Sequence, residues 1–176
     1  FRDLVDAGLQ GWELRLVGGS MPGAAHAAYL AQVQAAAQGY PIRIETDLPF
    51  AQLVERYQGA AVYWHAAGYG EDEQAAPIKA EHFGITTVEA MAAGCAPVVI
   101  ARGGQPEVVT HGVDGFLWQT LDELRGYTLR LLAGDRLRAQ IAAAAQASSR
   151  RFDHGHFVAN LAATLQRAAI PAAVET

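Results

Sequence analysis

Short apolar runs alternate with amphipathic or alanine-rich segments along most of the chain. The apolar runs are bounded by glycine, proline or polar residues, as expected of strands buried between helices. The predicted strands are residues 12–17, 42–45, 61–65, 96–101 and 115–118. The predicted helices are residues 24–38, 49–58, 85–93, 106–110, 121–132, 136–148 and 152–169. This alternation predicts right-handed crossovers and an α/β fold with a Rossmann-like parallel sheet flanked by helices.

The ends of the predicted strands carry glycine-rich and polar segments. Ligands of parallel sheets bind outside the carboxyl ends of the strands. The segments that follow predicted strands are residues 18–19, 66–80, the turn at Gly84 and residues 103–104. We therefore expect these segments to converge on one cleft. A glycine there either admits a ligand close to the backbone or only allows the turn, and for Gly19 and Gly104 both alternatives stay open.

The segment 81–94 places a short predicted helix between two glycines. Gly84 stands at the entrance of the helix and Gly94 at its exit, the usual place of a left-handed cap. The amino end of the helix therefore falls at residues 83–86, where backbone N–H groups lack intrahelical partners and carry a partial positive charge. Such an end suits a phosphate group, and Gly84 would let a ligand approach the backbone closely.

Two carboxylates, Glu81 and Glu89, flank this helix end. Glu89 lies about one turn into the helix, where its carboxylate can accept hydrogen bonds from a vicinal diol such as a ribose. Two carboxylates would repel a diphosphate, so they make chemical sense as ligands of hydroxyl groups. An acid in the first turns of a helix also favours the helix dipole without any ligand, and the spacing alone does not decide between these interpretations.

The motifs around this segment carry a family resemblance. In chain order they are Glu81-His82-Phe83-Gly84-Ile85, Glu89-Ala90-Met91-Ala92-Ala93-Gly94, Ala96-Pro97-Val98-Val99, Gly103-Gly104-Gln105-Pro106-Glu107-Val108-Val109 and Gly112-Val113-Asp114-Gly115-Phe116-Leu117. Together they resemble the C-terminal domain of the retaining family-four glycosyltransferases, which are GT-B enzymes. The similarity is dense over residues 12–132 and weaker beyond them.

The resemblance implies a domain that binds a nucleotide-sugar donor, from which the complete enzyme transfers a hexose to a hydroxyl acceptor with retention. The donor would be a GDP- or UDP-sugar, and neither a metal nor another cofactor is expected. Glu81 is implied as the catalytic residue of this domain, and Thr46 is implied near the nucleobase. The implied donor-binding residues are Phe83, Gly84, Ile85, Thr86, Glu89, Gly19 and Gly104.

The chain is expected to form a single Rossmann-like domain over residues 1–176, with C-terminal helices at about 121–170. The resemblance places the N-terminal acceptor domain, and a loop that supplies an Arg and a Lys, before the first residue. We therefore expect the chain alone to bind donor weakly and to transfer nothing. Two alternatives remain: another GT-B enzyme, such as a sugar-nucleotide epimerase or a phosphorylase, and a non-catalytic nucleotide-sugar-binding module.

The composition narrows the classes of protein further. Hydrophobic residues make up 51% of the chain and charged residues 18%, as in a soluble globular domain, and the net charge of −5 argues against nucleic acid as a partner. No apolar run approaches the roughly 20 residues needed to span a bilayer, and we expect no signal peptide at the start of the chain. We therefore expect a cytoplasmic protein without a transmembrane segment, of unknown oligomeric state.

Three single residues are expected to have ordinary structural roles. His65 ends an apolar strand, where a lone histidine is more often a hydrogen-bonded structural residue than a catalyst. Cys95, the single cysteine, is expected to be a small buried side chain rather than a reactive thiol. Lys79, the only lysine, is expected to be solvated in its loop. No histidine or cysteine cluster offers a metal site.

Overall fold

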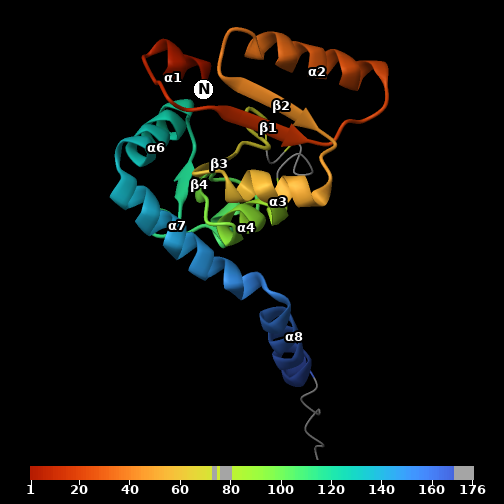
Figure 1. Cartoon of the computed structure of the whole chain (residues 1–176). Coiled ribbons are helices and arrows are strands. Elements are labelled where there is room, and N and C mark those ends of the chain that lie inside the picture. The colour runs from red at the N-terminus through yellow and green to blue at the C-terminus, as the bar shows by residue number, and fades with distance from the viewer. Residues whose placement is uncertain (73–74, 76–80, 169–176) are drawn as a thin grey trace, which may run out of the picture. The chain divides into compact units, whose positions relative to one another are not determined.

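The computed structural model of the chain describes residues 1–72, 75 and 81–168. The chain divides into two compact units, Phe1–Gly59 and Ala60–Thr176, each with a parallel sheet of its own. Figure 1 shows the elements of both units. The predicted α/β class with parallel strands flanked by helices is confirmed, whereas the single domain over residues 1–176 stays a prediction.

The first unit is built on a two-stranded parallel sheet. Its elements are α1 (Arg2–Asp6), β1 (Leu14–Gly18), α2 (Ala24–Ala37), β2 (Ile42–Thr46) and α3 (Phe50–Gln58). Leu14 pairs with Ile42 at one end of the sheet and Gly18 with Thr46 at the other. The helix α2 connects the two strands and supplies the crossover that parallel neighbours require.

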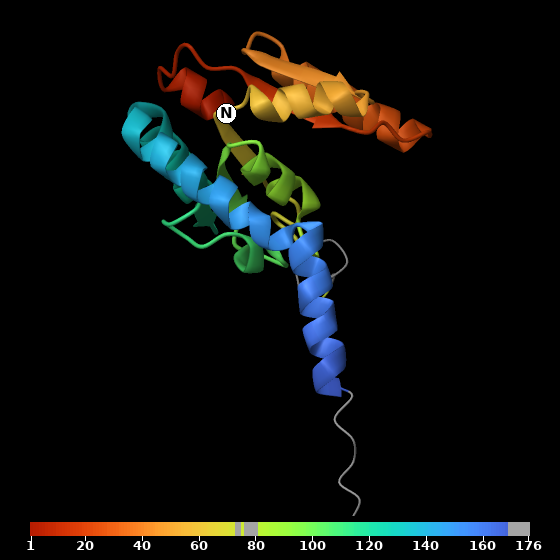
Figure 2. The same cartoon turned by 60° about the horizontal axis from the view of Figure 1, so that its bottom comes forward.

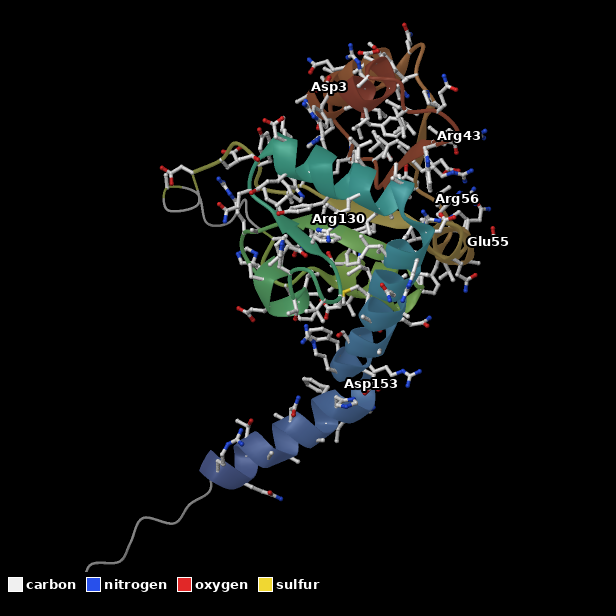
Figure 3. All side chains as sticks on the ribbon, turned by 90° about the vertical axis from the view of Figure 1, so that its left-hand side faces the viewer. Asp3, Arg43, Glu55, Arg56, Arg130 and Asp153 are labelled. Carbon is white, nitrogen blue, oxygen red and sulfur yellow. The ribbon has the colours of Figure 1, made fainter. Side chains whose placement is uncertain are left out.

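Charged side chains connect β1, β2 and α3 within this unit. Glu45 of β2 accepts a bond from Arg56 of α3 at 2.9 Å, and the same guanidinium lowers the pKa of the Glu45 carboxyl. Glu13 contacts both Arg15 (2.8 Å) and Arg43 (2.5 Å). Arg43 and Arg56 are labelled in Figure 3. These carboxylates therefore have protein partners and need no bound cation to explain them.

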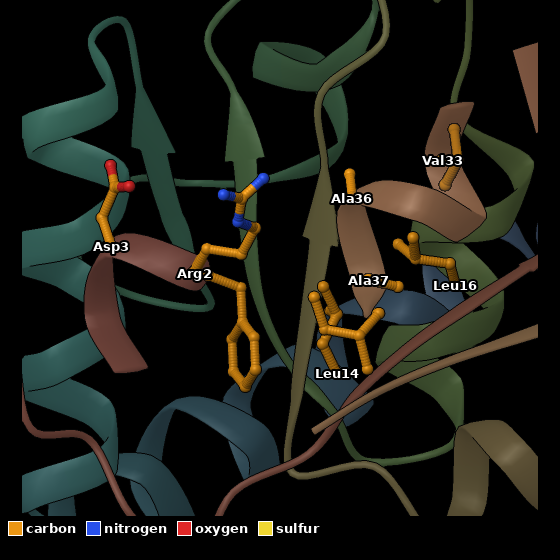
Figure 4. A pocket seen from close by; sticks show the side chains of 9 residues that line it. Arg2, Asp3, Leu14, Leu16, Val33, Ala36 and Ala37 are labelled. Atoms are coloured by element: carbon orange, nitrogen blue, oxygen red, sulfur yellow. The ribbon is translucent and has the colours of Figure 1, made fainter. Parts of the chain in front are cut away.

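A hollow of about 490 Å³ lies between α1, β1 and α2, as Figure 4 shows. The residues that line it are Phe1, Arg2, Asp3, Leu14, Leu16, Val33, Ala36, Ala37 and Ile42. Most of these side chains are apolar, and none belongs to the residues for which the sequence predicts ligand chemistry. The hollow is thus a feature of the first unit and adds no residue to the predicted site.

The second unit holds a three-stranded parallel sheet in the order β3–β4–β5. Its elements are β3 (Val62–His65), α4 (Ile85–Ala92), β4 (Ala96–Ile100), α5 (Gln105–Val108), β5 (Phe116–Trp118), α6 (Leu121–Ala133), α7 (Asp135–Ser149), the 3-10 turn η2 (Arg150–Phe152) and α8 (His154–Ala168). Val98 of the central strand pairs with Trp64 on one side and Phe116 on the other. Every residue of β4 is buried, which explains its unbroken apolar sequence.

Two hydrophobic clusters cover the opposite faces of this sheet. On one face, Val98 of β4 packs in a cluster with Leu131 of α6. On the other face, Val99 packs in a cluster with Met91 of α4 and Ala145 of α7. Figures 1 and 2 show α4 and α7 side by side, in agreement with their contacts. The sheet therefore holds α4 rigidly between β4 and α7.

The last helix begins later than the apolar pattern predicts. The predicted helix starts at residue 152, whereas α8 starts at His154, after the turn η2. Asp153, labelled in Figure 3, causes the break: its backbone is extended and its Oδ1 accepts the N–H of His156 at 2.8 Å, as an N-cap does. That bond also lowers the pKa of the Asp153 carboxyl. Within the described part of the chain, no helix is both long and apolar enough to cross a membrane.

Cys95 lies between α4 and β4 and its side chain is fully buried, which confirms the predicted structural role. Burial raises the pKa of the thiol to about 11, so at about pH 8 the thiol is almost entirely protonated. We expect the folded protein to resist alkylation by iodoacetamide and the protein in concentrated guanidinium chloride to react rapidly. Intact-mass spectrometry over time measures both rates; equal rates would contradict the buried placement.

Candidate functional site

The turn of residues 81–86 leads into α4 through a glycine in a left-handed conformation. Gly84 has φ +90° and forms the N-cap, and its carbonyl accepts the N–H groups of Thr87 (3.0 Å) and Val88 (3.1 Å). Gly94 ends the same helix with φ +89°, as predicted from the sequence. The N–H groups of Ile85 and Thr86 lie in the first helical turn, where no intrahelical acceptor is available.

Glu81 folds its carboxylate back onto this turn. Its Oε1 accepts the N–H of Phe83 at 3.3 Å and of Gly84 at 3.1 Å. Its Oε2 lies 3.6 Å from Nε2 of His65 at the end of β3, and about a third of the side chain (34%) stays exposed. Burial alone would raise the pKa of the Glu81 carboxyl, but the two N–H groups and His65 outweigh it and lower that pKa. Glu81 is therefore an ionised hydrogen-bond acceptor at neutral pH.

The two sides of α4 divide its residues between the core and the surface. Thr87, Ala90 and Met91 are fully buried, whereas Ile85 is 64% exposed and Glu89 is half-buried. Residues four apart lie on the same side of a helix, so Ile85 and Glu89 share one side. The structure thus brings together Glu81, Phe83, Gly84, Ile85, Thr86 and Glu89 around one helix end, and their contacts with a donor stay predictions.

The loop of residues 103–104 packs directly against the 81–86 turn. The N–H of Gly104 donates to the carbonyl oxygen of Glu81 at 2.8 Å. A Cβ added to Gly104 would overlap the carbonyl oxygen of His82, and one added to Gly103 would overlap that of Glu81. These glycines therefore allow close backbone contact. Gly104 therefore has a packing role in the structure. Its contact with a donor stays a prediction.

Two polar residues that support the turn were not singled out in the sequence. Tyr63 of β3 donates from its hydroxyl to Thr86 Oγ1 at 2.8 Å, and burial raises the pKa of the tyrosine. Gln105 is fully buried, and its Oε1 accepts the hydroxyl of Thr87 at 2.9 Å. The alternation in β3 offered one signal: Val62 and Trp64 pack on one face of the sheet, while Tyr63 packs on the other with the α4 side.

The corner between α7 and α8 also touches the turn. The rings of Phe83 and Phe152 meet edge to face, with centroids 5.4 Å apart. Arg151 donates to the backbone carbonyls of Glu107 (3.0 Å) and Val108 (2.5 Å) at the end of α5. The turn is thus held by β3, by the 103–104 loop and by η2, so its backbone geometry is set by the surrounding unit rather than by the loop itself.

Three residues discussed in the sequence analysis do not lie at this turn. Two belong to the first unit, and one lies outside the described part of the chain. Gly19 and Thr46 belong to the first unit, Phe1–Gly59. There the N–H of Ser20 donates to Asp47 Oδ1 at 2.8 Å, which ties the loop after β1 to the end of β2. The ligand contacts of Gly19 and Thr46 stay predictions. Lys79 lies outside the described residues, and the predicted absence of a metal is likewise untested.

The sequence matches the family model of the group 1 glycosyl transferases over residues 1–148. The chain belongs to this family. The glycosyltransferase family predicted from the motifs is therefore confirmed, together with its GT-B type of α/β fold.

Two glycosyltransferases are similar in sequence to this chain over part of their length. A D-inositol 3-phosphate glycosyltransferase of Xylanimonas cellulosilytica is 41% identical over 91 residues, which are 51% of this chain and 21% of that protein. A GDP-Man:Man(3)GlcNAc(2)-PP-Dol alpha-1,2-mannosyltransferase of Dictyostelium discoideum is 38% identical over 78 residues, 44% of this chain and 15% of that protein. The matched part of the chain thus spans about a fifth or less of either relative.

Solved structures of other proteins share the fold. Anabaena HepE in complex with UDP superposes with a TM-score of 0.75 at 25% identity, over 94% of this chain and 43% of HepE. Sucrose-phosphate synthase from Thermosynechococcus elongatus superposes with a TM-score of 0.67 at 24% identity, over 88% of this chain and 38% of that chain. The chain therefore spans less than half the length of these two solved structures.

Proposed function

We propose that this chain is the donor-binding domain of a retaining glycosyltransferase, which moves a hexose from a GDP- or UDP-sugar to a hydroxyl acceptor. The observation that carries the proposal is the arrangement of Glu81 and Glu89 on either side of the amino end of α4, in a chain of this family. HepE, which shares the fold, was solved with UDP, and one relative is named for GDP-mannose. Both observations support a nucleotide sugar as the ligand.

The amino end of α4 would receive the diphosphate. The Glu81 carboxylate already occupies the N–H groups of Phe83 and Gly84, so the phosphate contacts fall to Ile85 and Thr86. Their N–H groups point out of the first helical turn, where the helix dipole adds a partial positive charge. Tyr63 donates to the Thr86 hydroxyl oxygen, which leaves the Thr86 hydroxyl proton for a phosphate oxygen. Such preorganised donors stabilise the charge on a departing diphosphate.

The two carboxylates would bind the hydroxyl groups at the two ends of the donor. Glu89 lies one turn along the outer side of α4 and would accept bonds from the ribose hydroxyls. Glu81 lies before the helix, on the other side of the phosphate position, and would accept from hydroxyls of the transferred sugar. The acceptor and the remaining catalytic groups would belong to a further domain of the complete enzyme, so the chain alone is expected to transfer nothing.

A thermal-shift screen of UDP-glucose, GDP-mannose and ADP-glucose against the full-length protein tests this function. A ligand at about 100 times its dissociation constant stabilises a protein by about 2.7 kcal/mol, which produces a clear rise in Tm. We expect one nucleotide class to raise the Tm and the corresponding product, a hexose on a hydroxyl acceptor, to form in a coupled assay. Absence of a shift with every nucleotide sugar at millimolar concentration would reject the proposal.

Replacing Glu81 by glutamine is expected to discriminate between the sugar and the nucleotide parts of the donor. The variant loses a charge-assisted acceptor for sugar hydroxyls, so its affinity for the nucleotide sugar should fall about tenfold while that for the free nucleoside diphosphate stays within about twofold. Isothermal calorimetry with UDP-glucose against UDP, or GDP-mannose against GDP, measures both values. An equal loss of affinity for both ligands would show that Glu81 contacts the nucleotide part of the donor rather than the sugar.

A further inference from the structure

His65 stands at the end of β3 with its imidazole directed at Glu81. Its side chain is only 9% exposed, and its Nε2 faces Oε2 of the Glu81 carboxylate at 3.6 Å. The other ring nitrogen, Nδ1, is buried and has no hydrogen-bond partner among the described residues. Tyr63, two positions earlier in the same strand, contacts Thr86. Alternate residues of one strand therefore support both ends of the 81–86 turn.

The two ring nitrogens of His65 have different surroundings, and this difference selects a tautomer. Burial lowers the pKa of the imidazole despite the nearby carboxylate, so the ring is neutral at pH 7 and carries one N–H. A buried N–H without an acceptor is costly, and the described residues offer Nδ1 no acceptor. Nε2 faces an ionised carboxylate, which is a strong acceptor. The proton therefore belongs on Nε2, where His65 can donate toward Glu81.

We propose that His65 is a positioning residue that fixes the orientation of the Glu81 carboxylate through its Nε2–H group. The inference rests on the proposed function, in which Glu81 contacts the transferred sugar. Two backbone N–H groups hold Oε1, and His65 faces Oε2, so the plane of the carboxylate is defined from both sides. The outer lone pairs of both oxygens then point away from the turn, toward sugar hydroxyls.

The separation of 3.6 Å is longer than a formed hydrogen bond. Hydrogen bonds of binding and catalytic groups are often long before the ligand is bound and shorten in the complex. We expect a small rotation of the Glu81 side chain to close this gap when the donor binds. Without the Nε2–H group, Oε2 has no side-chain donor from β3, and the carboxylate is free to turn away from the sugar.

Two variants of the full-length protein separate a positioning role from a packing role. His65→Gln keeps an N–H donor near the position of Nε2, whereas His65→Leu keeps much of the volume without a donor. Calorimetry with UDP-glucose and GDP-mannose, and with UDP and GDP alone, should show about a tenfold loss of nucleotide-sugar affinity for His65→Leu, with the affinity for the nucleotide alone retained. His65→Gln should restore most of the affinity, and in a Glu81→Gln background His65→Leu should have no further effect.

A ligand-free measurement decides the same point independently. In protein labelled with ¹⁵N-histidine, the His65 ring should show the Nε2–H tautomer, and its Nε2 shift should change in Glu81→Gln. His111 serves as an internal reference because its Nδ1 accepts the N–H of Leu117 at 3.1 Å, which fixes its proton on Nε2. An Nδ1–H tautomer, a Nε2 shift that ignores Glu81, or an equal effect of His65→Leu in both Glu81 backgrounds would overturn the inference. If Glu81→Gln leaves sugar binding unchanged while the Nε2 shift still responds, the proposed function fails and the His65–Glu81 pairing stands.

Discussion

Replacing Gly104 by alanine is expected to loosen the 81–86 turn and to abolish measurable donor binding. The backbone of Gly104 has φ −77°, which alanine tolerates, so the effect comes from contact rather than from backbone strain. The new methyl group would overlap the carbonyl oxygen of His82 and approach Cα of Phe83 to 2.9 Å. Backbone atoms cannot rotate aside as a flexible side chain can, so the turn itself must move.

The displacement should also be visible in the stability of the protein. Overpacking of this kind lowers the free energy of unfolding by about 1–3 kcal/mol. In a protein of this size, each kcal/mol lost lowers the Tm by about 2–4 °C, and in a larger protein by less. The hydrogen bond from Gly104 N–H to Glu81 would lengthen with the same movement. Differential scanning calorimetry and a titration with UDP-glucose or GDP-mannose measure the two effects on the same sample.

Gly126→Ala is the matched control for this substitution. Gly126 lies on the exposed side of α6, and an added Cβ meets no atom within 4 Å. Alanine in the middle of a helix is about 0.5–1 kcal/mol more favourable than glycine, so this variant should keep or raise the Tm and bind donor normally. If Gly104→Ala behaves like Gly126→Ala, the close packing of the 103–104 loop on the turn does not exist in solution.

Sequence patterns correctly predicted the helices and strands whose bounds depend only on residues within or next to them. The run Ala96–Ile100 forms a strand buried on both faces, and the glycines at 84 and 94 mark the ends of α4 with positive φ values. The start of α8 was missed because Phe152 continues the apolar pattern, while the capping bond of Asp153 to His156 ends it. Boundaries of this kind depend on single side-chain bonds that periodicity does not contain.

The support of the site could not be predicted because it joins segments far apart in the sequence. The positions of Glu89 and of the amino end of the helix could be predicted from the glycines and from helix geometry. The contact of Gly104 with Glu81, by contrast, connects two loops that follow different strands. The His65–Glu81 pair joins the end of β3 to the turn before α4, which residues 66–80 separate in the sequence. His65 was accordingly expected to be only a hydrogen-bonded structural residue, whereas its place beside Glu81 gives it a specific partner.

Replacing Glu89 by alanine is expected to weaken binding of the free nucleotide and of the nucleotide sugar together. In the proposed function the carboxylate accepts bonds from two ribose hydroxyls, and a hydrogen bond to a charged group contributes about 1.5–3 kcal/mol. Even one such bond corresponds to roughly tenfold in the dissociation constant, so the loss should be about tenfold or more. Glu89 is half-buried on the side of α4 opposite Ala90 and Met91, and alanine is a better helix former, so folding should be unaffected.

Two further variants, one at Glu81 and one at a remote carboxylate, test whether the effect is specific to Glu89. Asp122 of α6 has a side chain that is 86% exposed and pairs only weakly, at 3.2 Å, with Arg125, so Asp122→Ala removes a carboxylate from the same unit without touching α4. Calorimetry with UDP or GDP should show the loss for Glu89→Ala and not for Asp122→Ala, whereas Glu81→Gln affects the sugar-bearing ligand alone. Unchanged nucleotide affinity in Glu89→Ala would show that Glu89 does not bind the ribose hydroxyls. The outer side of α4 would then have to bind the donor through Ile85 and Thr86 only, with the acid serving the helix dipole.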